Sequence, residues 1–147
     1  MKLLYPGGFD LLHAGHINAL NLARKMAGPS GSLVVAVNTD SFMSEYKRVP
    51  ARTQQERVDD VIATGLADEV ILWHGPEKQD EQILHNNPYV YVASFDWVDR
   101  DLARQLRIPS LSWMDDQGIS LLYIHRTPGI STTLLINKQV EQNEHSG

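Results

Sequence analysis

The sequence contains no cysteine, which excludes disulfide bonds, thiolate metal sites and cysteine nucleophiles. It also has no excess of positive charge, because 13 Lys and Arg stand against 18 Asp and Glu, giving a formal net charge of −5. Outside any local basic pocket, we therefore expect no binding to nucleic acid and none to a membrane surface.

Long apolar segments are absent as well. The apolar residues before Pro6 are too few for the core of a signal peptide, and no run approaches the roughly 20 residues that span a bilayer. The 147 residues correspond to one ordinary domain, and an apolar content of 42% suffices for its core. We expect a cytoplasmic protein with a single domain over residues 1–137 and a polar C-terminal tail over residues 138–147.

Short apolar runs alternate with segments of helical periodicity, a pattern that predicts β-α-β units around a parallel sheet. The expected fold class is α/β, a single doubly wound, Rossmann-like domain with a mainly parallel sheet. The first strand is expected to stop at Pro6. The expected strands cover residues 2–5, 33–37, 70–73 and 89–92, and the expected helices cover about 14–26, 53–65, 77–85, 98–106 and a stretch from 131 onward.

The segment 110–124 is compatible with two arrangements. Leu111-Ser112-Trp113 could form a strand that turns at residues 115–118 into a second strand over 121–124. Alternatively, an irregular excursion could precede a single strand. The sequence does not decide between them.

The first predicted strand leads through Gly7-Gly8-Phe9-Asp10 into a helix that begins around His13-Ala14-Gly15-His16. Glycines let backbone N–H groups approach a ligand at the positive end of a helix dipole, where phosphate is favoured. His13 and His16 share a face of the first turn and can donate hydrogen bonds to a phosphoryl group. An isolated pair at this spacing would more often be a surface pair or an adventitious metal site. The preceding strand and glycine turn favour the functional interpretation.

A second candidate phosphate cradle lies near the C-terminus. Gly129-Ile130-Ser131 leads into Thr132 and a leucine-rich helix, so hydroxyl and amide donors gather at a helix N-terminus. Ser131 and Thr132 could serve only as helix caps. Arg126 favours phosphate binding, because its guanidinium can clamp two phosphate oxygens.

Three motifs carry a resemblance to a known family. They are G-x-F-D-x-x-H-x-G-H over residues 7–16, Glu56-Arg57 on a predicted helix, and R-T-x-G-I-S-T-T over residues 126–133. Over roughly residues 1–137 the chain resembles the HxGH nucleotidyltransferases, specifically the cytidylyltransferase-like branch, and within it the bacterial glycerol-3-phosphate cytidylyltransferases. At average residue frequencies, the six fixed positions of the first motif would match by chance on the order of once in ten million starting points.

The resemblance implies transfer of CMP from CTP to a small phosphorylated alcohol such as glycerol 3-phosphate, with release of pyrophosphate. It implies Mg²⁺ bound with the nucleotide and a homodimer. The implied catalytic residues are His13, His16, Lys47 and Arg126. The implied nucleotide-binding residues are Gly7, Gly8, Phe9, Asp10, Gly15, Arg57, Thr127, Gly129, Ile130, Ser131 and Thr132. The implied acceptor-binding residues are Asp96 and Trp97.

Several alternatives stay open. Arg48 could replace Lys47 as the phosphate contact, Arg57 could be a solvated helix residue paired with Asp59 or Asp60, and Trp97 could be a core residue. The same motifs would serve an ATP-dependent enzyme, as in FAD synthetases or ADP-heptose synthases, or an inactive nucleotide-binding module. We name no metal ligands, and we expect His74, His85 and His125 to be structural or surface residues.

The chain departs from the glycerol-3-phosphate cytidylyltransferase pattern at a few positions. Ser94-Phe95 precedes Asp96-Trp97 where those enzymes read G-D-D-W, Gly65 stands where they carry an Arg, and Gly8 stands where they often carry a Thr. These departures leave the transfer motifs intact and concern the second substrate.

Overall fold

A computed structural model describes residues 1–75, 79–94, 101–106, 108 and 110–125 of the chain. Its strands are β1 (Lys2–Gly7), β2 (Ser32–Asn38), β3 (Glu69–Trp73), β4 (Val90–Ser94) and β5 (Ser120–Ile124). They form one sheet in the order β3-β2-β1-β4-β5, and every neighbouring pair is parallel. The predicted α/β fold with a parallel sheet is confirmed.

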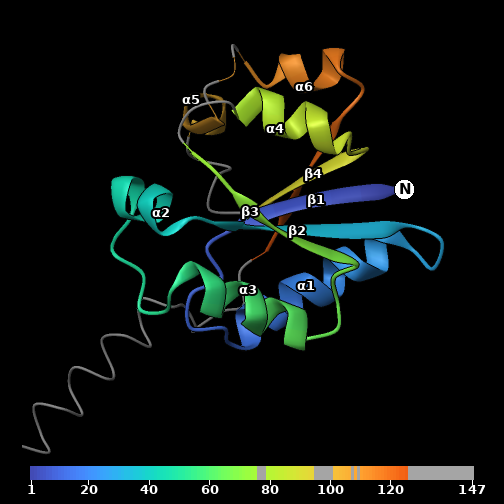
Figure 1. Cartoon of the computed structure of the whole chain (residues 1–147). Helices are drawn as coiled ribbons and strands as arrows, with labels where there is room; N and C mark the ends of the chain where they lie inside the picture. The colour runs from blue at the N-terminus through green and yellow to red at the C-terminus, as the bar shows by residue number, and fades with distance from the viewer. Residues whose placement is uncertain (76–78, 95–100, 107, 109, 126–147) are drawn as a thin grey trace, which may run out of the picture.

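Helices cover both faces of this sheet (Figure 1). α1 (Ala14–Ala27) and α3 (Gln54–Ala63) lie on one face, and α4 (Gln79–Asn86), α5 (Leu102–Leu106) and α6 (Ser112–Asp116) lie on the other. α2 (Asp40–Tyr46) follows the carboxyl end of β2. The arrangement is therefore doubly wound, as the alternating pattern of the sequence predicts.

Each strand contributes to two separate cores, because successive side chains of a strand point to opposite faces. Leu3 packs with the buried face of α1 and with Val61 of α3. Leu4 packs in the other cluster, with Ile83 of α4 and Met114 of α6. Because both faces are covered, the central strands are apolar throughout, which explains the uninterrupted run at residues 33–37.

The first strand is longer than expected. β1 continues through Pro6 to Gly7, and both residues keep their register with β2, opposite Ala36 and Val37. The pairing of β1 with β4, in contrast, covers only Leu3 and Leu4. Pro6 has no N–H to donate, but at its position β1 pairs on one side only, as at a sheet edge where proline is tolerated. The expectation that Pro6 ends the strand is wrong.

Other elements differ from the prediction in detail. α2 was not expected. In the segment 110–124 the second alternative is correct, because the short helix α6 precedes the single strand β5. The capping box that opens α3 is present, with Thr53 accepting from Glu56 N–H and Glu56 accepting from Thr53 N–H. The expected helix from residue 131, the boundary at 137 and the tail 138–147 lie outside the described residues.

The topology indicates where a ligand binds. β1 leads through α1 to β2 on one side, whereas β4 and β5 lie on its other side, so the strand order reverses beside β1. Open α/β sheets bind ligands outside the carboxyl ends of the strands at such a switch point. The histidine-bearing loop follows β1 at this edge. No helix among the described residues is long and apolar enough to span a membrane.

Candidate active site

His13 and His16 form a reciprocal capping box at the start of α1. The Gly15 N–H donates to His13 Nδ1 at 3.0 Å, and the His13 N–H donates to His16 Nδ1 at 3.2 Å. The two rings stack with centroids 3.9 Å apart and an interplanar angle of 23°. The predicted proximity of the two imidazoles is therefore present, and backbone groups of the same turn hold both rings.

This capping box determines which nitrogen of each ring carries hydrogen. An Nδ1 atom that accepts from a backbone N–H cannot itself be protonated, so each neutral imidazole carries its hydrogen on Nε2. His13 and His16 thus present two Nε2–H donors at the N-terminus of a helix. Such a pair suits an anionic oxygen.

Electrostatics keep these imidazoles neutral. Burial is the largest cause that lowers the pKa of His16, and together with the charges of His13 and Lys47 it brings the pKa to about 3, while Asp10 acts in the opposite direction. Burial and the charge of Lys47 also lower the pKa of His13. At neutral pH both residues are therefore hydrogen-bond donors without a formal charge.

The turn before these histidines is closely packed. A Cβ added at Gly7 would lie 2.9 Å from the Phe9 ring, and one at Gly8 would lie 3.0 Å from Met43 Cε. Phe9 and Leu11 adopt positive φ angles of 53° and 49°, which are uncommon for bulky residues. A side chain at position 7 would therefore collide with the buried Phe9 ring, whereas one at position 8 would require only a small shift of the flexible end of Met43.

Asp10 fastens this turn to the loop that precedes α3. Its buried carboxylate accepts hydrogen bonds from Arg48 Nη1 (2.6 Å), Ala51 N–H (2.8 Å) and Arg52 N–H (2.9 Å). Burial raises the pKa of this carboxyl, but the hydrogen bonds and the charge of Arg48 outweigh it and hold the pKa below its ordinary value. Nucleotide binding by Asp10 stays a prediction, and the observed bonds give Asp10 a positioning role.

Arg57 is fully buried and binds four acceptors. Its Nη1 donates to the carbonyls of Gly8 (2.9 Å) and Asn38 (2.7 Å). Its Nε donates to the Arg52 carbonyl (3.1 Å), and its Nη2 donates to Asp40 Oδ1 (2.7 Å). The alternative of a solvated Arg57 is wrong, because its guanidinium joins the carboxyl ends of β1 and β2. Its contact with nucleotide stays a prediction.

The structure places both candidates for the phosphate contact, Lys47 and Arg48, close to the histidine turn. Lys47 ends α2, where its N–H donates to the Met43 carbonyl, and its charge acts on the imidazoles of both His13 and His16. Arg48 is held by Asp10 through Nη1, while its Nε and Nη2 atoms are buried without a hydrogen-bond partner in the described part of the chain. Both side chains therefore lie where an anion would be stabilised, and the sequence preference for Lys47 stays a prediction.

The remaining predicted residues divide into two groups. Gly15 lies in the first turn of α1, and its N–H donates to the capping side chain of His13, as described above. The other group lies outside the described residues and follows β4 and β5: Asp96, Trp97, Arg126, Thr127, Gly129, Ile130, Ser131 and Thr132.

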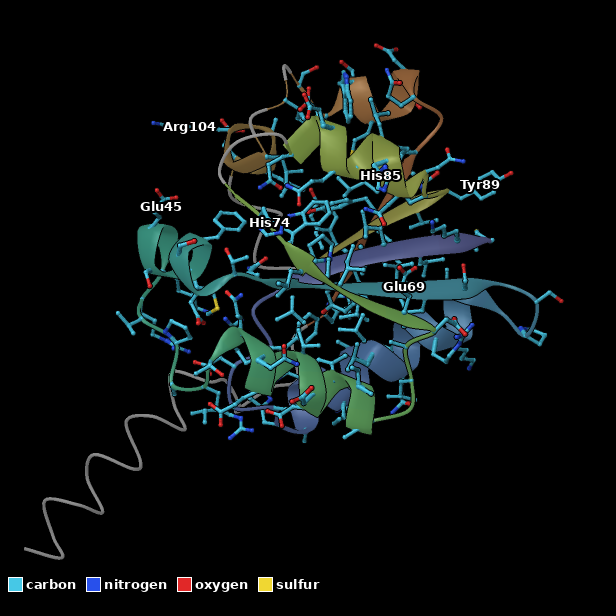
Figure 2. All side chains as sticks on the ribbon, viewed as in Figure 1. Glu45, Glu69, His74, His85, Tyr89 and Arg104 are labelled. Atoms are coloured by element: carbon cyan, nitrogen blue, oxygen red, sulfur yellow. The ribbon has the colours of Figure 1, made fainter. Side chains whose placement is uncertain are left out.

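The described residues contain no group of three or more His, Asp or Glu side chains that could hold a metal ion. His74 lies near the carboxyl end of β3 and His85 lies on α4, away from each other (Figure 2). The carboxylate of Asp10 is bound to Arg48, and Asp40 Oδ1 is bound to Arg57. A hard cation would therefore find most of its oxygen ligands on substrate phosphates and water, which is the usual way Mg²⁺ is held with nucleotides.

Sequence reasoning missed three residues that organise the site. Asn38 and Asp40 flank the end of β2, and Arg52 lies in the loop before α3, where its carbonyl accepts from Arg57. Asp40 follows Thr39 directly after a buried strand, a position that could have been recognised as the start of a helix at the ligand edge.

The chain is similar to proteins of a known family. The family described as cytidylyltransferase-like matches residues 4–138. Glycerol-3-phosphate cytidylyltransferase from Bacillus subtilis (strain 168) is 31% identical over 132 residues, which cover 90% of this chain and 92% of that protein. FAD synthase from Methanopyrus kandleri is 42% identical over 73 residues, which cover 50% of this chain and 49% of that protein.

A solved structure shares the fold. The lipopolysaccharide core biosynthesis protein from Thermoplasma volcanium GSS1 superposes with a TM-score of 0.67 at 23% sequence identity. The superposition covers 86% of this chain and 96% of that protein. The architecture is therefore one that other proteins of this size adopt.

Proposed function

The chain belongs to the cytidylyltransferase-like family, and from this premise we propose that it transfers CMP from CTP to a small phosphorylated alcohol. Glycerol 3-phosphate is the first candidate acceptor, because the relative from Bacillus subtilis that carries this name aligns over 90% of the chain. The reaction releases pyrophosphate.

One observation supports the proposal most directly, the pair of neutral Nε2–H donors at the N-terminus of α1. In the proposed reaction a phosphate oxygen of the acceptor attacks the α-phosphorus of CTP in line. A new P–O bond forms, and the bond to the pyrophosphate oxygen breaks. The donors of His13 and His16 stabilise negative charge on the α-phosphoryl and pyrophosphate oxygens, where positioning and electrostatics supply most of the rate enhancement.

Cationic side chains would hold the remaining phosphate charge. Lys47 acts electrostatically on both histidines, and Arg48, held by Asp10, has buried Nε and Nη2 donors whose partners a phosphate would supply. Arg126, Ser131 and Thr132 are proposed to contribute from the segment after β5. Asp10 and Arg57 keep the loops of this site in place through the contacts described above.

We propose Mg²⁺ as the cofactor, bound together with the triphosphate. Bound there, it would neutralise phosphate charge and help to orient the pyrophosphate leaving group. The residues present fit a cation that arrives on the nucleotide, because the described carboxylates at the site are bound by arginines.

ATP is the second candidate nucleotide, with a different class of acceptor. The match to FAD synthase favours it, since identity there reaches 42%. That match covers only 73 residues, about half of each chain, whereas the glycerol-3-phosphate cytidylyltransferase aligns over 132 residues. CTP is therefore the preferred donor.

A pyrophosphate-release screen tests the proposal by crossing four nucleoside triphosphates with a panel of phosphorylated acceptors and Mg²⁺. We expect the highest rate with CTP and glycerol 3-phosphate, and a larger rise in melting temperature with CTP than with ATP. Activity confined to ATP would select the alternative. No release with any pair would overturn the proposed transferase activity.

The acceptor can be tested through Phe95, which replaces an Asp of the glycerol-3-phosphate cytidylyltransferase pattern. A carboxylate can accept hydrogen bonds from a polyol, whereas a phenyl ring favours a less hydroxylated or larger acceptor. Phe95→Asp should shift the ratio of kcat/KM values toward glycerol 3-phosphate. If the native protein already uses glycerol 3-phosphate efficiently and the variant behaves identically, Phe95 does not select the acceptor.

We also propose that the protein acts as a homodimer, as the resemblance implies. Sedimentation velocity at micromolar concentration tests this directly, and a monomer throughout would contradict it.

A further inference from the structure

Phe9 combines three features that its neighbours in the loop do not share. Its side chain is only 3% exposed, its φ angle is +53°, and its ring contacts both Tyr5 and His16. The centroid distance is 5.4 Å to Tyr5 in an edge arrangement and 5.7 Å to His16 in a tilted one. The ring therefore lies between the buried end of β1 and a catalytic imidazole.

The positive φ angle is costly for a phenylalanine, because its Cβ crowds the backbone in that region. Two glycines precede it, and a glycine at position 9 would adopt the same backbone without strain. A bulky residue persists in such a conformation only when its surroundings hold it there, and such positions cluster at functional sites. Here the surroundings are the core of α1 and α3 that encloses the ring.

We propose that Phe9 is a positioning residue for His16, whose imidazole it holds in the orientation that accepts from the His13 N–H and directs Nε2–H to the substrate. The inference rests on the proposed function, because it concerns the same site. Phe9 would then act through His16 and would not contact the substrate with its side chain.

The charges that face His16 show why the ring matters. His13 stacks on it at 3.9 Å, Lys47 acts on it as a positive charge, and among the described residues Asp10, itself bound to Arg48, is the negative group that acts on it. Burial is the largest cause of the low pKa of His16, and the Phe9 ring supplies part of that burial. Without the ring, water would reach the imidazole and its pKa would rise toward the ordinary value.

Protonation of His16 would break the capping box. A proton on Nδ1 would face the His13 N–H, so a donor would oppose a donor and the first turn of α1 would lose this bond. A variant without the ring should therefore lose activity as the pH falls, at a higher pH than the native protein. The loss should appear in kcat more than in KM, because the donors act on the transferring group.

The decisive experiment measures the imidazole ¹⁵N chemical shifts of the native protein and of Phe9→Leu by NMR during a pH titration. In the native protein we expect His13 and His16 as neutral Nε2–H tautomers at neutral pH, and His16 to stay neutral far below its ordinary pKa. In Phe9→Leu the titration of His16 should move upward by about one pH unit or more, and the acid limb of kcat should move with it. The exposed His74 and His85 supply internal reference signals.

Val61→Ala is the matched control, because Val61 is fully buried in the same core and belongs to α3 rather than to the histidine turn. It should lower stability without moving the His16 titration. Phe9→Met is the second variant, should Phe9→Leu fail to fold. An Nδ1–H tautomer or a titration near pH 6.5 for native His16 would overturn the proposal. So would an unchanged His16 titration in the ring-less variants.

These readouts separate the proposal from the proposed function. The NMR titration needs no turnover, so a protein without transferase activity but with the expected tautomers would contradict the function and retain the role of Phe9. Transfer of CMP with an Nδ1–H tautomer at His16 would contradict the role of Phe9 and retain the function.

Discussion

At both ends of the β1–β2 pair, arginine and aspartate side chains bind backbone groups of the connecting segments, but the two ends differ in exposure and in the turns that they stabilise. At the amino end, Asp68 accepts from the Leu33 N–H at 2.7 Å and pairs with Arg24. Arg24 also donates to the carbonyls of Gly28 (3.2 Å) and Gly31 (2.9 Å). These bonds tie the last turns of α1 and the start of β2 to the neighbouring loops, and the Arg24–Asp68 pair lies partly in solvent.

At the carboxyl end, the carboxylate of Asp10 and the guanidinium of Arg57 are both buried. They also bind backbone groups, but the turn that they hold contains two residues with positive φ and two imidazoles. Within the described residues the imidazole Nε2 atoms take part in no hydrogen bond, because the bonds of both rings use Nδ1. At the amino end, an arginine and an aspartate only stabilise the connections between elements. At the carboxyl end, the same residue types hold a turn with positive φ angles, whose imidazole donors stay available for a ligand.

The largest effect on activity should follow from His16→Gln, which separates the structural role of His16 in the capping box from its proposed role in catalysis. Gln at the third helical position can still accept from the His13 N–H and keep the capping box, but it has no imidazole donor at Nε2. We expect activity to fall by about two to four orders of magnitude with little change in melting temperature.

Pyrophosphate release and thermal unfolding check this variant together. Unchanged turnover would show that His16 does not take part in the reaction. It would also contradict the claim that the carboxyl end of the β1–β2 pair differs from the amino end by its function.

Arg57→Met should have the next largest effect, on stability and activity together. The substitution leaves the carbonyls of Gly8 and Asn38 buried without their donor and Asp40 without its partner. We expect a loss of about 3 kcal/mol in the free energy of unfolding, measured by urea denaturation. Arg57→Lys should recover only part of it, because the planar fork is lost. Native stability in Arg57→Met would show that the arginine does not hold the strand ends.

Asp10→Asn should lower the free energy of unfolding by less than Arg57→Met does, and its effect should depend on pH. An amide would turn an N–H₂ group toward a backbone N–H that now donates to the carboxylate, which costs about 2 kcal/mol at pH 7. Because the native pKa of Asp10 lies below its ordinary value, the stabilisation by the carboxylate is complete above the unfolded pKa of about 4. It is lost as the pH falls through the native pKa.

Urea denaturation of the native protein and Asp10→Asn at a series of pH values checks this dependence. The two curves should converge in acid. A stability difference that grows toward low pH would contradict the sign of the argument.

The smallest effect should come from the amino end. Asp68→Asn retains an oxygen for the Leu33 N–H and loses only the charge attraction to Arg24 in a partly exposed pair. We expect a destabilisation below about 1 kcal/mol and unchanged kcat/KM. A large loss of activity in this variant would show that the amino end influences the site at the carboxyl end, and would contradict the claim that the two ends act independently.

Hydrophobic pattern and motif spacing were sufficient to predict most of the fold. The apolar run at residues 33–37 and the capping box at Thr53 each predicted an element that the structure confirms. α2 was not foreseen, because it is short and its sequence, DSFMSEY, lacks a clear apolar period. The continuation of β1 through Pro6 depends on which neighbour the strand pairs with at that point, and this is a tertiary property.

The site was predicted in part. The spacing of His13 and His16 indicated a shared helical face, because it depends on local geometry alone. The burial of Arg57 could not be inferred, since its acceptor Gly8 lies 49 positions away along the chain. The pairing of Asp10 with Arg48 spans 38 positions for the same reason. Long-range polar contacts follow from loop placement, which no local pattern encodes.

The central claim is that the neutral histidine donors at the carboxyl end of β1 carry out nucleotidyl transfer. ³¹P NMR of the protein with CTP, Mg²⁺ and glycerol 3-phosphate, followed over time, tests it most directly. The account predicts that pyrophosphate and a diphosphate linking cytidine to glycerol appear in equal amounts, and that His16→Gln forms both about 100-fold more slowly or worse. Equal rates for the two proteins, or CTP binding without either product for any acceptor tried, would contradict it.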